Sequence, residues 1–316
     1  MKLAIFGGSG VVGQAVLPRL LTAGHRLRAM RHRSPLSVED VEVVEGSISD
    51  PTAVAETIGD ADVVLQLTKG GDGVEQAVET SVRGTINVLD AIGRSPGVTQ
   101  YLLTSSDAAT GIWSHRQRKP ISHRTRPASY PGYYSLGKVL EEVIVSEYRR
   151  NGSLPYTIAR LSYVQQDDSA LRQFIANYDP KRPGRGPFDS AYSPEQRQRL
   201  KQGQPFVVLP CGKDGEPLGR TLVQREDVVD GLLGMVGSAK ALGQVFHLSG
   251  PGFGYDRPSA YLAEKLGLPV ERVKLPDAYS FDIDVSHTTR QLGWSPKFDV
   301  IAMLDAALAW REANTG

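Results

Sequence analysis

A tyrosine and a lysine in the segment YYSLGK have a spacing that could support acid–base chemistry. Tyr134 and Lys138 are four residues apart, so in a helix they lie one above the other on the same face. One interpretation is chemical, because an ammonium near a phenol stabilises the phenolate and lowers a pKa that is ordinarily about 10. The other is coincidence, because the spacing recurs in YLAEK, between Tyr261 and Lys265. The surrounding sequence must decide between the two pairs.

A glycine-rich segment near the amino terminus could hold a pyrophosphate. GGSGVVG, residues 7–13, follows the first apolar run and opens an amphipathic segment. Its glycines keep the turn tight and let the backbone approach phosphate oxygens at a helix N-terminus. The alternative is a turn without a ligand, but the position directly after a strand favours a binding site. The expected cofactor-binding residues of this segment are Gly7, Ser9, Gly10, Val11, Val12 and Gly13.

The end of the second expected strand indicates which dinucleotide binds. An Asp or Glu about 20 residues beyond such glycines would bond the adenosine ribose hydroxyls of NAD. Here the segment reads AMRHRS, with Arg31 where the acid would stand. Arg31 and Arg33 could pair with a 2′-phosphate, and Ser34 could add a hydroxyl donor. We therefore predict NADP(H) rather than NAD(H) as the cofactor, with a solvated basic turn as the alternative.

The elements that would position these residues alternate between strands and helices. Apolar runs predict strands at residues 2–7, 25–30, 41–46, 61–67, 99–106 and within 154–164, with amphipathic segments between most of them. This alternation predicts an α/β fold, a Rossmann-type doubly wound parallel sheet covered by helices. Ser106 ends the fifth strand, where ligands bind in open parallel sheets, and Tyr134 would begin a helix beside that end.

The second half of the chain is less regular. Residues 167–219 are rich in proline, glycine, arginine and glutamine and have few apolar residues, so they form either a long solvated excursion or a segment that covers the substrate. Helices are expected after Glu226, around 259–267 and 286–294, and at 300–313, with a strand at 244–250. We assign residues 1–164 and about 220–240 to an NADP-binding Rossmann domain. Residues 165–219 and 241–316 would form a smaller, irregular substrate-binding domain.

Composition argues against several classes of function. The 316 residues include 36 Lys and Arg against 35 Asp and Glu, which leaves no global charge to attract nucleic acid or a membrane surface. The single cysteine, Cys211, excludes an internal disulfide, and none of the six histidines has metal-ligand spacing. No signal peptide or membrane-spanning run is apparent. We expect a cytoplasmic protein that binds a small molecule, with no metal.

Several motifs occur in a fixed order along the chain. They are GxxGxxG at 7–13, EGSISD at 45–50, GTINVL at 84–89, LLTSSDAATG at 102–111, YxxxK at 134–138, VQREDVVDGLL at 223–233 and LGWSPKF at 292–298. This ordered set resembles the extended short-chain dehydrogenase/reductase family, which includes NAD-dependent sugar-nucleotide epimerases and dehydratases. The resemblance runs nearly end to end, and YLAEK, with no serine-bearing strand end before it, is better explained as a surface helix.

This resemblance implies roles for particular residues. Tyr134 would act as general acid or base on the reacting oxygen, Lys138 would hold the nicotinamide ribose and lower the tyrosine pKa, and Ser106 would bond the substrate oxygen. Hydride would pass directly between the nicotinamide and a substrate carbon. Further cofactor contacts would come from Ser47 and Ile48 at the adenine, from Leu67, Thr68 and Lys69 after strand four, and from Leu161, Ser162 and Val164 at the nicotinamide.

Departures from the family pattern narrow the chemistry. Dehydratases of this family carry Thr-Asp-Glu at the end of strand five, whereas this chain has Ser106, Asp107 and Ala108, so dehydration is disfavoured. Asp107 nevertheless occupies the place of the acid. Arg220 matches an arginine that binds the nucleotide diphosphate in epimerases, so both residues are candidate substrate contacts. The usual P-x-x-V-Y-G after strand six is also absent.

Three functions follow from these residues. The first is an NAD(P)-dependent oxidoreductase that acts on a ketone or secondary alcohol of a sugar-like or other polar substrate. The second is a sugar-nucleotide epimerase that retains NAD. The third, a non-catalytic NADP-binding sensor, is disfavoured because Tyr134 and Lys138 are both kept.

Two further expectations concern partners. Residues 139–148, VLEEVIVSEY, are apolar enough to form a homodimer interface, although the same stripe could pack on its own sheet. The loop cations Lys181, Arg182 and Arg185 could receive an anionic group of the substrate, and the loop histidines His115 and His123 could contact it. Solvated side chains are the alternative for all five.

Overall fold

The computed structural model describes residues 1–114, 116–117, 119–152, 154–176 and 188–314. His115, Lys181, Arg182 and Arg185, which the sequence marks as candidate substrate contacts, lie outside the described residues. No helix among these ranges is both long enough and apolar enough to cross a membrane.

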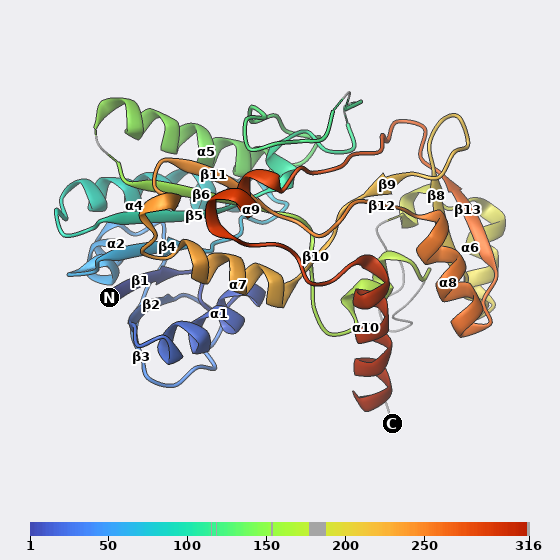
Figure 1. The fold of residues 1–316 in the computed structure, drawn as a ribbon, viewed down its shortest axis with the longest axis horizontal. Coiled ribbons are helices and arrows are strands. Elements are labelled where there is room, and N and C mark those ends of the chain that lie inside the picture. Colours follow the sequence, from blue (N-terminus) through green and yellow to red (C-terminus); the bar gives the residue numbers. More distant parts are fainter. Residues whose placement is uncertain (115, 118, 153, 177–187, 315–316) are drawn as a thin grey trace.

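Seven parallel strands form the central sheet (Figure 1). From one edge to the other they are β11 (Gln244–Leu248), β6 (Tyr156–Leu161), β5 (Gln100–Ser106), β4 (Val63–Gln66), β1 (Lys2–Phe6), β2 (Arg26–Arg31) and β3 (Val41–Glu45). The chain builds outward from β1 first to one side and then to the other, which leaves a switch point between β1 and β4. The predicted Rossmann-type doubly wound sheet is confirmed.

Helices cover both faces of the sheet because the side chains of each strand alternate between the faces. Leu3 and Ile5 pack in one core with α1 (Val11–Thr22) and α7 (Arg225–Met235). Ala4 and Phe6 point the other way, into a core with α2 (Pro51–Ile58), α4 (Gly84–Gly93) and α5 (Tyr133–Asn151). The site residues at the strand ends are therefore mounted on a scaffold that is fixed from two sides.

The helix α5 has clear start and stop signals. Pro131 and Gly132 precede it, and Gly132 has φ +137°, a conformation that an L side chain rarely adopts. Arg149 and Arg150 occupy the last turn, where positive charge complements the helix dipole. Against α5 packs η1 (Ala77–Arg83), a π-helical segment that follows the short helix α3 (Val74–Gln76).

A second unit lies beside the sheet, with its own hydrophobic core (Figure 1). Its elements are η3 (Ser169–Gln173), η4 (Asp189–Ala191), α6 (Pro194–Lys201), β8 (Val207–Cys211), α8 (Asp256–Leu266), β13 (Val270–Lys274) and α10 (Val300–Asn314). Two short pairs, β9 (Gly219–Arg220) with β12 (Phe253–Gly254) and β7 (Val164–Gln165) with β10 (Val223–Gln224), connect it to the sheet.

The described part of residues 167–219 is not the solvated excursion that its composition suggests. Phe174, Phe188, Phe206 and Val207 are all buried in the second core. The strand β8 pairs in parallel with β13, a pairing that the sequence analysis does not contain. A few large apolar residues, spaced between prolines and glycines, are enough to build this core.

The strand β11 corrects the proposed domain boundary. It lies within residues 241–316, which the sequence analysis assigns to the second domain, yet it pairs with β6 along its whole length. The helix α9 (Ser286–Leu292) also packs against β11, and Trp294 is buried in the core under α1 and α7. The Rossmann unit therefore draws on the chain well beyond residue 240.

Candidate active site

The turn between β1 and α1 is shaped for close contact with an anion. Gly7 has φ +86°, and a Cβ there would lie 2.7 Å from the backbone carbon of Leu67. A Cβ on Gly13 would lie 2.4 Å from the carbonyl oxygen of Gly8. Gly10 precedes the helix with no side-chain cap, and the first turn of α1 carries no acid. These features fit a dinucleotide pyrophosphate, which would meet free amides at the helix N-terminus.

The structure brings Ser106, Tyr134 and Lys138 to the carboxyl ends of β4 and β5. Ser106 is the last residue of β5, and Lys138 donates a hydrogen bond from Nζ to the Thr104 carbonyl of the same strand, at 2.9 Å. Lys138 also donates to the carbonyl of Thr68, at 3.0 Å, beside the glycine turn. The Lys69 ammonium lies 5.1 Å from the centre of the Tyr134 ring. Residues from three separate segments thus meet beside the switch point.

The state of Tyr134 differs from the expectation for a tyrosine paired with a lysine. Burial raises the pKa of Tyr134 to about 12; hydrogen bonding by Ser106 opposes this shift, and the negative charge of Asp107 adds to it. The predicted lowering of the tyrosine pKa is therefore wrong for this structure. The phenol is held in its protonated form, in which it can donate a proton.

Asp107 lies in the same site and is almost fully buried. Its Oδ1 accepts a hydrogen bond from Ser106 Oγ at 3.2 Å, and within the described chain its Oδ2 has no well-aligned partner. Burial raises the pKa of Asp107 to about 6, against the opposing positive charge of Arg220. This carboxyl group can therefore exchange a proton near neutral pH.

Arg220 is buried although all the partners that the structure describes for it are uncharged. Its Nη1 donates to Gln173 Oε1 at 3.3 Å and to the Tyr255 hydroxyl at 3.4 Å. The guanidinium also lies over the rings of Trp113 and Tyr163, at 5.3 and 5.5 Å from their centres. A buried cation without a carboxylate in direct contact favours an anionic group of a ligand.

At the expected adenine end, Arg31 has a partner that the sequence analysis did not consider. Glu45 stands opposite Arg31 in the β2–β3 pairing, and Arg31 Nε donates to Glu45 Oε1 at 2.7 Å. Both side chains are largely exposed, as are Arg33 and Ser34.

Ser47 and Ile48, the residues expected at the adenine, are already engaged within the protein. Ile48 is buried against α4, and its carbonyl accepts a hydrogen bond from the Asn87 side chain at 3.0 Å. The hydroxyl of Ser47 forms a hydrogen bond with that of Ser49.

At the expected nicotinamide end, Leu161 lies directly beside Ser106 in the β5–β6 pairing. The buried hydroxyl of Ser162 bonds Thr221 and Ser249, at 3.0 and 2.8 Å, so it is occupied within the protein. Val164 pairs with Val223 where the two units meet. These residues run from the end of β6 into β7, where the chain passes from the sheet to the second unit.

A sequence profile of the NAD dependent epimerase/dehydratase family matches residues 3–248. The chain belongs to this family. Its structure resembles a short-chain dehydrogenase/reductase superfamily protein from Agrobacterium tumefaciens with bound NAD, with a TM-score of 0.83 at 22% identity over 100% of this chain and 98% of that one. It also resembles the UDP-glucose 4-epimerase of Thermotoga maritima with UDP-glucose, with a TM-score of 0.76 at 20% identity over the whole of both chains.

One curated protein is similar in sequence to part of this chain. A 2-alkyl-3-oxoalkanoate reductase from Stenotrophomonas maltophilia is 33% identical over 129 residues, which are 38% of this chain and 37% of that protein. The match thus spans little more than a third of the relative's length.

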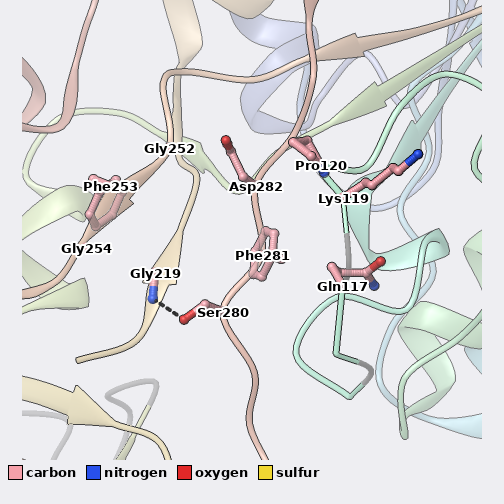
Figure 2. Close-up of a pocket in the computed structure, with 10 residues that line it drawn as sticks. All are labelled: Gln117, Lys119, Pro120, Gly219, Gly252, Phe253, Gly254, Ser280, Phe281 and Asp282. Carbon is pink, nitrogen blue, oxygen red and sulfur yellow. Dashed lines mark hydrogen bonds between the residues drawn. The ribbon is translucent and has the colours of Figure 1, made fainter. Parts of the chain in front are cut away.

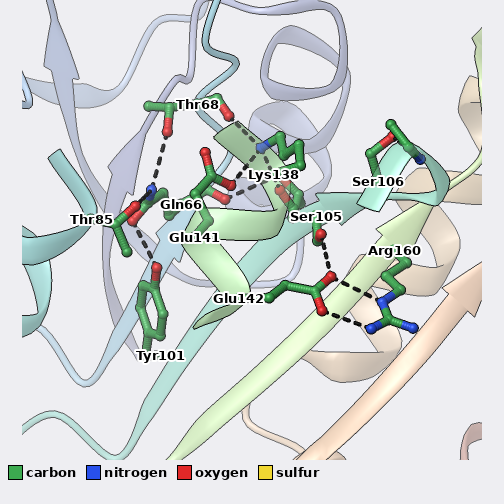
Figure 3. A network of polar contacts seen from close by, with 12 residues as sticks. Gln66, Thr68, Thr85, Tyr101, Ser105, Ser106, Lys138, Glu141, Glu142 and Arg160 are labelled. Carbon is green, nitrogen blue, oxygen red and sulfur yellow. Dashed lines mark hydrogen bonds and ion pairs between the residues drawn. The ribbon is translucent and has the colours of Figure 1, made fainter. Parts of the chain in front are cut away.

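A buried polar network under the site escaped the sequence analysis of this family member (Figure 3). Glu142 accepts hydrogen bonds from Arg160 at 2.7 and 2.9 Å and from Ser105 at 2.5 Å. Glu141 accepts one from Lys138 at 2.8 Å. The available signal was a pair of adjacent acids within an otherwise apolar helix stripe, three and four residues after the lysine.

Two cavities lie near this site. One of about 520 Å³ is bordered by residues on both sides of Tyr134, namely Ser114, Ser129, Tyr130, Pro131, Gly132, Tyr133 and Leu136. Figure 2 shows the other, of about 440 Å³, lined by the β9–β12 pair, residues 280–282, Gln117, Lys119 and Pro120. There the Gly219 amide donates to Ser280 Oγ at 2.9 Å.

Proposed function

We propose that this protein is an NAD(P)-dependent oxidoreductase that reduces a ketone, or oxidises the matching secondary alcohol, on a sugar-like or other polar substrate. The observation that carries this proposal is geometric: the Tyr134 phenol lies in the first turn of α5, beside Ser106 at the end of β5 and one helical turn before Lys138. A neutral phenol is the form that can donate a proton to a ketone oxygen.

The residues of the site divide this work between them. Ser106 would hold the substrate oxygen, and Tyr134 would donate its proton to that oxygen as the carbonyl is reduced. Lys138, anchored on the Thr68 and Thr104 carbonyls, would face the ribose next to the nicotinamide. The bound nicotinamide supplies the hydride. The relative that matches part of this chain is a 2-alkyl-3-oxoalkanoate reductase, which supports ketone reduction.

NADP(H) remains our proposed cofactor, with NAD(H) as the alternative. Arg31, Arg33 and Ser34 are accessible at the end of β2, and an exposed pair such as Arg31–Glu45 contributes little to stability, so a 2′-phosphate could displace Glu45. The structurally similar Agrobacterium protein has NAD bound, which supports the alternative.

A second candidate is a sugar-nucleotide epimerase that retains its cofactor. Arg220 favours it, because its buried cation with uncharged partners suits a diphosphate, and the similar Thermotoga protein binds UDP-glucose. A homodimer also remains a proposal, to which the exposed Leu136 and Val143 of α5 could contribute an apolar surface.

The test is to follow oxidation of NADPH and of NADH while screening 3-oxo acids, ketoses and nucleotide sugars. Net oxidation with a ketone supports the reductase. A nucleotide sugar that changes configuration without net oxidation supports the epimerase. No turnover of either kind, with a cofactor bound, would leave the sensor hypothesis.

Replacing Tyr134 by Phe removes the proton donor and keeps the ring. We expect kcat to fall by about 10²- to 10⁴-fold, while the Kd of the dinucleotide changes little. The matched control is Tyr261→Phe in the second YxxxK segment, because Tyr261 bonds Asp305 on the surface. Equal rates in wild type and Tyr134→Phe would contradict the role of Tyr134.

A further inference from the structure

Trp113, in the segment that follows β5, is held in a strained backbone conformation. Its φ is +66°, a value that a bulky residue rarely adopts, and the Ser114 amide donates to the Ile112 carbonyl at 2.8 Å, which closes a tight turn around it. The Trp113 carbonyl accepts a hydrogen bond from the Tyr279 amide at 2.9 Å, and its ring meets Phe281 edge-on, with centres 5.3 Å apart. Strain of this kind persists only where the surrounding contacts fix it, and it clusters at ligand sites.

The strained turn places the indole ring beside Arg220. The guanidinium carbon lies 5.3 Å from the ring centre of Trp113 and 5.5 Å from that of Tyr163. The two rings belong to the segments after β5 and β6, whereas Arg220 belongs to β9. A guanidinium over an aromatic face is attracted by the π electrons and keeps the N–H groups in its own plane available for hydrogen bonds. The two rings, which we call the aromatic clamp, therefore orient the guanidinium.

One edge of Arg220 remains free. Nε donates to the Thr221 carbonyl at 3.4 Å and Nη1 to the two uncharged partners given above, but Nη2 has no hydrogen-bond partner among the residues described. Arg220 is only 6% exposed, so its charge has little water to solvate it. The Thr221 hydroxyl bonds that of Ser162, and Leu161, just before Ser162, lies beside Ser106 in the sheet. Arg220 is thus tied closely to the strand end that carries Ser106.

We propose that Trp113 and Tyr163 are positioning residues that hold Arg220 with one edge free for an oxyanionic group of the substrate, a carboxylate or a phosphate. The planar N–H groups of a guanidinium bind such oxyanions through charge-assisted hydrogen bonds. The inference rests on the proposed function and narrows it, because the group bound at Arg220 belongs to the molecule whose ketone meets Ser106 and Tyr134. The expected substrate is therefore an anionic ketone, and its neutral analogue is disfavoured.

An NMR titration of the ¹⁵N-labelled protein tests the site without a known substrate. The probe is the Nε–H resonance of Arg220, assigned by its loss in Arg220→Met. Acetate, inorganic pyrophosphate and neutral acetamide are added separately at constant ionic strength. We expect an anion to move the resonance saturably and acetamide to leave it in place. Movement by acetate identifies a carboxylate site and movement by pyrophosphate a phosphate site. No saturable movement with either anion, or an equal movement with acetamide, would overturn the proposal.

Variants of the two rings test the clamp itself. Trp113→Leu should raise the Kd of the anion by about threefold or more, whereas Trp113→Phe, which keeps an aromatic ring, should stay within about twofold of the wild type. Tyr163→Leu and Tyr163→Phe should behave in the same way, and because Tyr163 is 52% exposed, this pair decides if Trp113→Leu does not fold.

Tyr279→Leu is the matched control, because Tyr279 is bonded to Trp113 through its backbone amide and its side chain is 40% exposed. It should leave the Kd of the anion unchanged. An equal loss of affinity in this control, or no loss in either clamp variant with leucine, would overturn the role of the clamp.

The titrations need neither cofactor nor turnover, so they separate this inference from the proposed function. Intact anion binding with a failed substrate screen would count against the proposed function alone. Once an anionic ketone is turned over, Trp113→Leu and Tyr163→Leu should raise its KM and change kcat little. Turnover with an unchanged KM in both variants would keep the proposed function and reject the clamp.

Discussion

At the scale of single residues, Arg31 shows why cofactor preference is hard to predict from residue type alone: the fold places an acidic residue beside it. The sequence contains no acid at the end of the second strand, which favours NADP. The sheet then places Glu45 of β3 directly opposite Arg31. Hydrogen bonding to Glu45 raises the pKa of Arg31 and lowers that of Glu45, as expected for an ion pair. A 2′-phosphate would have to compete with this carboxylate.

Glu45→Gln should therefore increase the affinity for NADP. We expect a decrease of up to about fivefold in the Kd of NADP, with the Kd of NAD unchanged, because an exposed ion pair is weak. Glu42→Gln is the matched control, since Glu42 also lies on β3 but pairs with Arg28. Fluorescence titration of both cofactors would measure the effect. An NADP affinity that stays equal in the two variants would argue against a phosphate site at Arg31.

The Tyr134 and Lys138 pair shows a similar limit to sequence reasoning. Their spacing and the helix that carries them were predictable, because periodicity and the motif order are local. The hydrogen-bond acceptors of Lys138 were not predictable. They include the carbonyls of Thr68, which follows β4, and of Thr104, near the end of β5, and both are far from Lys138 in the sequence. The charge of Glu141 was visible in the sequence, but its complete burial depends on the packing of η1 against α5.

At the scale of elements, the glycine turn depends on backbone contacts that leave no room for a side chain. Gly13→Ala would put a methyl group 2.4 Å from the Gly8 carbonyl oxygen and 2.6 Å from that of Gly7. We expect the turn to shift, the Kd of the dinucleotide to rise at least tenfold, and the melting temperature to fall. Calorimetric titration and thermal unfolding would measure the two effects.

Gly234→Ala provides the control for that substitution. Gly234 lies within the helix α7, and a Cβ there meets no atom within 4 Å. Alanine should stabilise this helix by about 0.5–1 kcal/mol and leave cofactor affinity unchanged. Similar losses of affinity in both variants would contradict the role of the turn.

The elements of the first half were largely predictable, and the structure also confirms the four helices and the strand predicted after residue 219, which are α7, β11, α8, α9 and α10. The short elements between residues 165 and 219, and the strand β13, were not predicted. Local signals suffice for elements of the first kind: Asp50, before Pro51, caps α2, because its side chain accepts a hydrogen bond from the Thr52 amide at 2.9 Å. Residues 207–211 were missed because a short apolar run between prolines gives too weak a period to indicate a strand. Its pairing with β13 depends on a segment about sixty residues later, which no local pattern can reveal.

At the scale of the whole molecule, one fully buried histidine and two partly buried ones should make the fold sensitive to acid. Neither ring nitrogen of His247 has a well-aligned partner in the described ranges, and burial together with the charge of Arg160 lowers its pKa to about 3. His123 and His287, whose rings stack with centres 3.8 Å apart, also have lowered pKa values because of burial. All three are therefore neutral in the folded protein near neutral pH.

The sign of the pH dependence follows from these shifts. The unfolded chain binds protons at its histidines near pH 6.5, before the folded protein does, so stability falls as the pH drops from about 6.5 towards 3. His247 alone can contribute up to about 1.4 kcal/mol per pH unit in this window. Asp107 changes the stability in the opposite direction. Its pKa in the folded protein is raised to about 6, so the folded protein binds this proton more tightly than the unfolded chain does. The stability that Asp107 contributes is therefore lost as the pH rises from 3.8 through 6.

His247→Phe removes the titrating group with the largest of these shifts. We expect the melting temperature of this variant to fall less steeply between pH 7 and pH 4.5 than that of the wild type. His32→Gln, at an exposed position on the surface, should follow the wild-type curve. Parallel curves for all three proteins would show that His247 does not govern acid stability.

The path of the chain ties the two units into one piece. After β6 the chain enters the second core, returns for α7 and β11, leaves again for β12, α8 and β13, comes back for α9, and ends in the second core with α10. No single cut can release either unit as a continuous fragment. Neither unit can therefore be moved to a related protein as one continuous segment. A chimaera that combines the sheet of one relative with the second unit of another has to replace several separate segments of the chain.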